Sequence, residues 1–170
     1  MASSFIKFNG NGFWAYDCYV ESFQLLLFER INDHTDIPWL VEYQRKIALD
    51  SLPLIYGGMT MYLDETITDE GRRLVLIEFI DKITNNIISH GGYLTGERLN
   101  SLRRNVLQYL VHIREFSWTD AEMEKIAKDS RWLDSDLSTD NYLKGFILLS
   151  DLVQGKLTFK VDSEITYWND

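Results

Sequence analysis

This chain has very little cysteine and very little proline. Its single cysteine, Cys18, excludes an internal disulfide and a zinc site built from several cysteines. Because the sequence around Cys18 is mostly apolar, we expect a buried structural thiol rather than a reactive one. Two prolines in 170 residues leave few helix breakers, which favours long helices.

Long apolar runs are also missing. No segment approaches the roughly 20 apolar residues that a membrane-spanning helix needs. The amino terminus lacks the basic and then apolar pattern of a signal peptide. We therefore expect a protein of the reducing cytoplasm with no membrane partner. Hydrophobic residues make up 45% and aromatic residues 14% of the chain, which is typical of a folded domain. Residues 1–170 are most simply a single domain.

Signatures of catalysis are absent as well. The histidines His34, His90 and His112 do not have the spacing of a zinc-binding pair. His90 precedes two glycines, where a helix cap is the favoured role. Glu78 and Asp81 are three residues apart, but a di-metal bundle would need a Glu-x-x-His motif on two helices. We therefore predict no catalytic residue, metal or cofactor, and an enzyme using this carboxylate pair is the weakest alternative.

The strongest helical pattern spans residues 68–90. Apolar residues recur there at the spacing of one helix face, and others widen that face beyond a single stripe. We expect a central helix that is covered on several sides, starts near Asp69 and Glu70, and stops at Gly91. The stripe consists of Leu76, Ile80, Ile83 and Ile87, and the widening residues are Leu74, Ile77, Phe79 and Ile88.

Five further helices are predicted by the same spacing. Two precede the central helix, one over residues 16–31 and one that begins near Pro38. Three follow it, and each has a capping residue between apolar residues in the hydrophobic-staple arrangement. These caps are Thr95, Thr119 and Ser138, and Glu122 completes a capping box with Thr119.

The segments between and beyond the helices contain turn signals. Asn9–Gly12 predicts a turn, because it lacks the strand and the Lys-Ser/Thr pair of a phosphate-binding loop. Residues 59–67 are predicted to be a loop, and the tail after Gly155 a short strand or an ordered coil tied down by Trp168. The predicted fold is an all-α single-domain bundle of about six helices, which allows short β segments at the termini.

The formal charge of −9 is unevenly distributed. Residues 13–70 hold eleven acids and three bases, and residues 115–140 hold eight acids and three bases. The segment between them, 71–114, is basic, with seven bases and three acids. An acidic protein repels phosphate backbones, so we expect no nucleic-acid partner. It attracts basic proteins and speeds their encounter, although acid excess can also serve solubility alone.

Two groups of carboxylates flank predicted helix starts. Helix-dipole complementarity explains part of each group, but seven carboxylates exceed what two helix termini need. We predict that they bind a protein partner. They are Asp64, Glu65, Asp69 and Glu70 before the central helix, and Asp134, Asp136 and Asp140 around the last one. Aromatic side chains that can anchor such a contact, or else pack in the core, are Trp39, Trp118, Trp132 and Tyr142.

Three stretches of the chain carry motifs that point to one group of proteins. The first stretch is Asn9-Gly-Asn-Gly-Phe-Trp14, followed by Asp17, Glu21 and leucines up to Leu27. The second consists of Trp39, Ala48, Gly58 and Leu63-Asp64-Glu65. The third is Leu152-Val-Gln-Gly155-Lys-Leu157, followed by Ser163, Ile165, Tyr167 and Trp168. Together they resemble small bacterial immunity proteins, which accompany polymorphic or contact-dependent growth-inhibition toxins.

The resemblance implies a non-enzymatic protein that binds the C-terminal domain of one cognate toxin and neutralises it. A basic, nuclease-type toxin would complement the acidic surface, because a nuclease site must be positive to hold phosphate. Residues 98–134 have no counterpart in the resemblance, so it assigns no partner-specific residues there. The alternative is an acidic helical adaptor or scaffold for another protein.

Overall fold

The computed structural model describes residues 3–34, 36–51, 61–91, 94–128 and 139–157. Side chains of residues 3, 16–18 and 139–144 are outside that description, so the environment expected for the Cys18 thiol stays a prediction. The described residues form six helices and three short strands, which confirms a mainly helical fold. Their bounds are β1 Ser3–Phe8, β2 Asn11–Tyr16, α1 Asp17–Ile31, α2 Pro38–Asp50, β3 Met61–Tyr62, α3 Glu70–Ser89, α4 Gly96–His112, α5 Asp120–Lys128 and α6 Thr139–Val153.

The strands form one small sheet in the order β2-β1-β3. β1 and β2 pair antiparallel, and β3 joins β1 in parallel with Ile6 opposite Met61. The fold is therefore not purely helical, and its third strand lies in the segment that was predicted to be a loop. The tail expected to form a strand or ordered coil, residues 158–170, lies outside the described residues.

The predicted turn at Asn9–Gly12 is the hairpin between β1 and β2. Asn9 and Gly10 both have positive φ, 49° and 75°, as a two-residue Asn-Gly hairpin turn requires. Gly12 is needed for a different reason. A Cβ atom on Gly12 would lie 2.3 Å from the backbone oxygen of Ile6, which is closer than any side chain tolerates.

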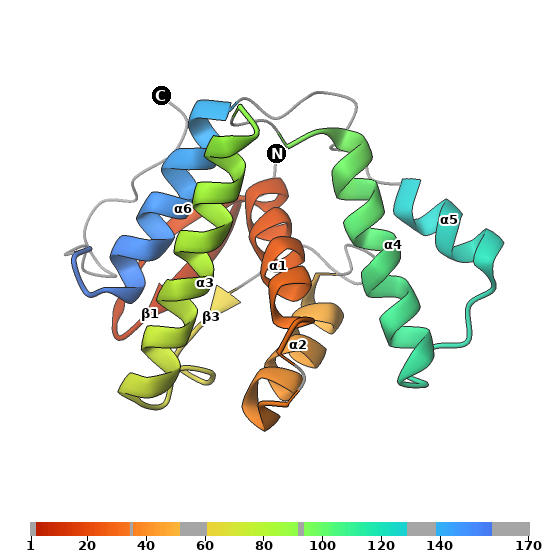
Figure 1. The fold of residues 1–170 in the computed structure, drawn as a ribbon, viewed down its shortest axis with the longest axis horizontal. Coiled ribbons are helices and arrows are strands. Elements are labelled where there is room, and N and C mark those ends of the chain that lie inside the picture. Colours follow the sequence, from red (N-terminus) through yellow and green to blue (C-terminus); the bar gives the residue numbers. More distant parts are fainter. Residues whose placement is uncertain (1–2, 35, 52–60, 92–93, 129–138, 158–170) are drawn as a thin grey trace.

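The helix at the centre of the molecule is α1, not α3. Every residue from 19 to 28 is buried, including the polar residues Glu21, Ser22 and Gln24. Figure 1 shows α1 between α3 and α6 on one side and α4 on the other. On the side of α6, the rings of Phe23 and Phe146 meet edge to face at 4.6 Å.

α3 was expected to be covered on several sides, and that expectation is wrong. Its narrow stripe is buried as predicted, but Leu74 and Ile88 are 56% and 53% exposed. The reason is that α3 packs against α6 and α1 and is open to solvent elsewhere. Ile77 is half-buried and Phe79 is buried, so only some of the residues that widen the apolar face are packed against other elements.

The predicted helix starts within the described residues are confirmed. Asp69 caps α3, because its side chain accepts a hydrogen bond from the backbone N–H of Arg72 at 2.9 Å. Thr95 caps α4 in the same way. Thr119 and Glu122 form the reciprocal bonds of a capping box at α5. The cap predicted at Ser138 lies outside the described residues.

α3 and α4 end differently from each other. His90 is the C-cap of α3, and its Nδ1 lies 2.8 Å from the backbone oxygen of Asn86, in keeping with the predicted capping role. Gly91 follows with φ 76°. After α4 the corresponding position is Arg114, whose φ of 62° is unusual for a residue other than glycine.

Candidate protein-binding surface

The structure brings together the first group of predicted carboxylates. We call Asp64, Glu65, Asp69 and Glu70 the acidic rim. They lie in the turn between β3 and α3 and in the first turn of α3. Glu65, Asp69 and Glu70 keep 71%, 58% and 61% of their side chains exposed. The acidic rim is therefore on the surface, where a partner can reach it.

Three of these carboxylates have cationic neighbours. Glu65 pairs with Lys46 of α2, and the Glu70 carboxylate accepts hydrogen bonds of 2.7 and 2.6 Å from the Arg73 guanidinium. Asp69 also lies 3.4 Å from Nε of Arg72. These pairs lower the charge that the acidic rim presents, so a docking cation has to compete with the chain's own bases.

The pKa values of these carboxyl groups reflect the same contacts. The Lys46 ammonium holds the pKa of Glu65 below its ordinary value, and the Arg73 guanidinium does so for Glu70. For Asp69 the largest cause of the lowered pKa is the backbone N–H of Arg72. All three groups are thus stabilised as anions and carry full charge at neutral pH.

Asp64 has a structural contact instead. Its Oδ1 accepts a hydrogen bond of 2.6 Å from the backbone N–H of Asn9, 55 residues earlier in the chain. The contact holds the hairpin turn against the segment that follows β3. Asp64 is nevertheless exposed.

The environment of the second predicted group of carboxylates is not described by the structure. Asp134 and Asp136 lie outside the described residues, and Asp140 belongs to the first turn of α6 without a described side chain. The same holds for Trp132 and for the side chain of Tyr142. Their roles in binding remain predictions.

Beside the acidic rim is a hollow between α2 and the start of α3, which we call the α2–α3 hollow. Its volume is about 330 Å³. Trp39 lines it, and the guanidinium of Arg72 lies 5.2 Å from the centroid of the Trp39 ring. Glu65 belongs to both the acidic rim and the hollow. The two features therefore form one continuous surface, with carboxylates beside a half-buried tryptophan.

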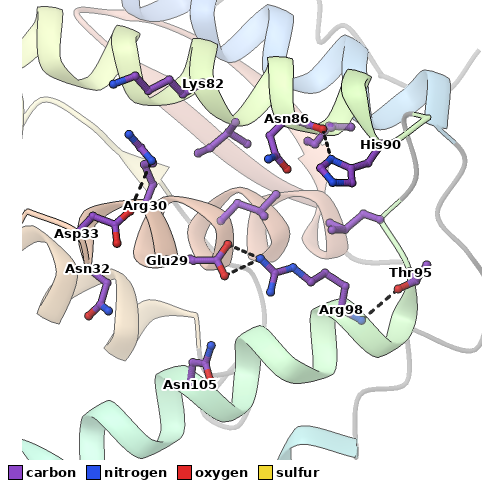
Figure 2. A pocket seen from close by; sticks show the side chains of 14 residues that line it. Glu29, Arg30, Asn32, Asp33, Lys82, Asn86, His90, Thr95, Arg98 and Asn105 are labelled. Atoms are coloured by element: carbon purple, nitrogen blue, oxygen red, sulfur yellow. Dashed lines mark hydrogen bonds and ion pairs between the residues drawn. The ribbon is translucent and has the colours of Figure 1, made fainter.

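A larger groove of about 870 Å³ lies over α1 between α3 and α4 (Figure 2). Its apolar base includes Leu26 and Ile87, and its rim is charged. The charges at its rim are paired: the Arg98 guanidinium donates to both carboxylate oxygens of Glu29 at 2.5 Å, Arg30 pairs with Asp33, and Lys82 pairs with Glu78 outside the groove. The groove therefore offers a partner shape and apolar contact but little free charge.

His34, Glu78 and Asp81 each contact other described side chains. His34 stacks against Phe79 with ring centroids 5.0 Å apart, far from the exposed His112 in the chain. Glu78 pairs with Lys82, and Asp81 accepts a hydrogen bond of 3.4 Å from Ser150. In the described part of the chain, no three His, Cys, Asp or Glu residues are placed to share a metal ion.

Sequence reasoning missed the buried ion pair between Glu21 of α1 and Arg103 of α4. Their side chains are 2% and 5% exposed, and Arg103 donates two hydrogen bonds to the carboxylate, at 2.5 and 2.6 Å. The one available signal was Glu21 itself, because it interrupts the apolar pattern of residues 16–31. The partner, 82 residues away, has no local signature.

Comparisons of this chain with protein-family models, with curated proteins and with solved structures find no match. None of the helices in the described ranges combines the length and the apolar character that a bilayer crossing requires.

Proposed function

We propose that this chain is a non-catalytic immunity protein that binds the C-terminal domain of a cognate toxin and neutralises it through the acidic rim. The observation that carries the proposal is the exposure of these carboxylates beside the α2–α3 hollow, which Trp39 lines. The motif resemblance of three stretches to small bacterial immunity proteins supplies the class of partner. A basic, nuclease-type toxin is the partner whose charge fits best.

The ion pairs of the acidic rim do not prevent such a contact. Exposed pairs contribute only about 0–1 kcal/mol each, because water screens them and ordering two long side chains costs entropy. A partner's lysines and arginines can therefore displace Lys46 and Arg73 at little cost. Trp39 adds the kind of aromatic anchor that dominates protein–protein hot spots.

The test is co-expression with the toxin domain encoded beside this chain. Restored growth and a stable one-to-one complex are the expected results. The informative variant is Glu65→Lys with Glu70→Lys, because both residues make only side-chain ion pairs. Asp64 and Asp69 are left intact, since they hold the hairpin turn and cap α3.

We expect this double variant to slow association by roughly tenfold or more, since electrostatic steering is worth that much in on-rate. The matched control reverses two exposed acids elsewhere, Glu97→Lys on α4 and Asp120→Lys on α5. It changes the net charge equally and is expected to have a clearly smaller effect. Equal slowing by both variants would show that the acidic rim is not the docking site, and growth arrest without a complex would remove the immunity function itself.

A further inference from the structure

The α2–α3 hollow contains a buried hydroxyl without a hydrogen-bond partner. Tyr43 of α2 lines the hollow and is 5% exposed. No described residue donates to or accepts from its hydroxyl oxygen. Burial raises the pKa of Tyr43 far above its ordinary value, so the hydroxyl stays neutral. Buried polar atoms in proteins almost always have a partner, so this hydroxyl is available to a water molecule or to a group supplied by a ligand.

A carboxylate that has no hydrogen bond or ion pair with the described residues lies in the same hollow. Asp50 is the last residue of α2, where the negative end of the helix dipole disfavours an anion. No hydrogen bond or ion pair joins its side chain to another described residue. Partial burial raises the pKa of Asp50, although nearby Lys46 opposes the shift. A cation bound beside Asp50 would offset both the unfavourable helix dipole and the cost of burying the carboxylate.

The charges around the hollow determine whether it favours a cation or an anion. Its lining includes three acids and three bases. Each base is already paired: Arg45 with Glu115, Lys46 with Glu65, and Arg72 with Asp69. Among the lining acids, Glu42 and Asp50 have no ion pair with any described residue. The free charge of the hollow is therefore negative.

We propose that the α2–α3 hollow is an anchor site for an arginine side chain of the partner protein, with the Asp50 carboxylate and the Tyr43 hydroxyl oxygen as its acceptors. A guanidinium fits because its five N–H donors form a planar fork that reaches two acceptors at once. A volume of about 330 Å³ is at the lower end of the range for small-ligand pockets, which suits one long side chain. The identity of the partner rests on the proposed function, whereas the chemistry of the hollow does not.

The test needs no toxin. Methylguanidinium is titrated into the full chain, and the Trp39 indole N–H and the Thr66 amide, both at the hollow, are followed by NMR. We expect saturable shifts at these positions, with binding about tenfold weaker in Asp50→Asn, the equivalent of losing one charge-assisted hydrogen bond. Tyr43→Phe is expected to weaken binding by a smaller factor while leaving the fold intact, since it removes a hydroxyl that has no hydrogen bond with the described residues.

The control is Asp120→Asn, an exposed acid on α5 outside the hollow, which is expected to bind like the wild type. The proposal is overturned if Asp50→Asn also titrates like the wild type, or if the shifts are spread over exposed carboxylates generally. Tighter binding of methylammonium than of methylguanidinium would overturn the choice of arginine. If the chain rescues growth but methylguanidinium does not bind in the hollow, this inference alone is wrong. If methylguanidinium binds saturably but the chain does not rescue growth, the proposed function alone is wrong.

Discussion

At the scale of single residues, the Glu21–Arg103 pair stands out because both charges are withdrawn from water. Arg103 also approaches Asn100 Oδ1 at 3.4 Å and the backbone oxygen of Ala127 at 3.5 Å, so α1, α4 and α5 meet at this guanidinium. Removing one partner of a buried pair leaves an uncompensated charge in the interior, which is far more costly than breaking a pair at the surface.

We therefore predict that Glu21→Gln lowers the free energy of unfolding by about 3–5 kcal/mol. The matched control is Glu124→Gln, which breaks the exposed pairs with Lys128 and Arg104 and is expected to cost about 1 kcal/mol or less. Urea unfolding followed by circular dichroism measures both. Similar losses in the two variants would mean that the buried pair is not a special contributor to stability.

A second residue-scale prediction concerns Arg114. It occupies the C′ position after α4, where Glu115 N donates to Leu110 O at 3.0 Å and Arg114 N donates to Val111 O at 3.0 Å. These bonds form a Schellman motif, which normally places glycine at this position. Gly155 has the same role after α6, with φ 71°.

Replacing Arg114 by Gly is expected to raise the free energy of unfolding by roughly 1 kcal/mol, because a left-handed conformation is strained for any residue with a Cβ. Gly155→Ala is the mirror experiment and is expected to lower it by a similar amount, since an added Cβ meets no atom there and only the backbone strain counts. Thermal unfolding of the two variants should move in opposite directions. Movement in the same direction would contradict the strain argument.

At the scale of elements, the starts of the helices were predictable because capping is local. A cap needs a side chain and backbone N–H groups only two or three residues away, so the bonds at Thr95 and Thr119 were predicted from the order of residues alone. At Asp69 the helix start was predicted, and the structure adds the capping bond. The turn of the hairpin was predicted from Asn9–Gly12, but β3 was not, because its residues 61–62 pair with Ile6 and Lys7 from a distant part of the chain.

The cap of α3 gives a prediction about pH. The pKa of Asp69 is lowered in the folded chain, so its contribution to stability is present above the ordinary value of 3.8 and is lost as the pH falls through the folded value. Asp69→Asn keeps a capping side chain without a titrating group. Unfolding free energies measured from pH 7 downwards past pH 3.8 are expected to draw together between the two proteins as the Asp69 carboxylate becomes protonated. Parallel curves would show that the cap does not contribute through its charge.

At the scale of the whole molecule, the decisive feature is which helix has neighbours on all sides. The apolar pattern of residues 68–90 suggested the centre, yet α3 leaves Leu74 exposed, while α1 buries ten consecutive residues that include three polar ones. Periodicity shows which face of a helix is apolar, but it does not show how many other elements pack around it.

This placement predicts a clear difference between two identical substitutions. Leu27→Ala in α1 removes a fully buried side chain and is expected to cost about 2–5 kcal/mol, because a cavity remains. Leu74→Ala in α3 removes an exposed one and is expected to change stability by less than about 0.5 kcal/mol. Chemical denaturation compares them directly. A large loss of unfolding free energy for Leu74→Ala would contradict the conclusion that α3 is open to solvent on this side.

For the candidate site, sequence reasoning predicted which carboxylates gather at the start of α3 but not how each one is engaged. Glu70 and Arg73 are three residues apart, so their pair was readable from helix geometry. The partners Lys46 of Glu65 and Asn9 of Asp64 come from distant parts of the chain. The helix that begins near Pro38 was predicted, but the lack of a described partner for its Tyr43 hydroxyl depends on what packs around that side chain.

The sequence by itself determined the mainly helical character, the caps and stops of the helices, the hairpin turn and the excess of acid, because each depends on residue types or on contacts within a few residues. Only the tertiary structure decided that α1 is the central helix, that Glu21 is buried against Arg103, and that the acidic rim borders a hollow lined by Trp39 and Asp50. Those features depend on distances between residues that are tens of positions apart, and such distances are set by packing of the whole chain.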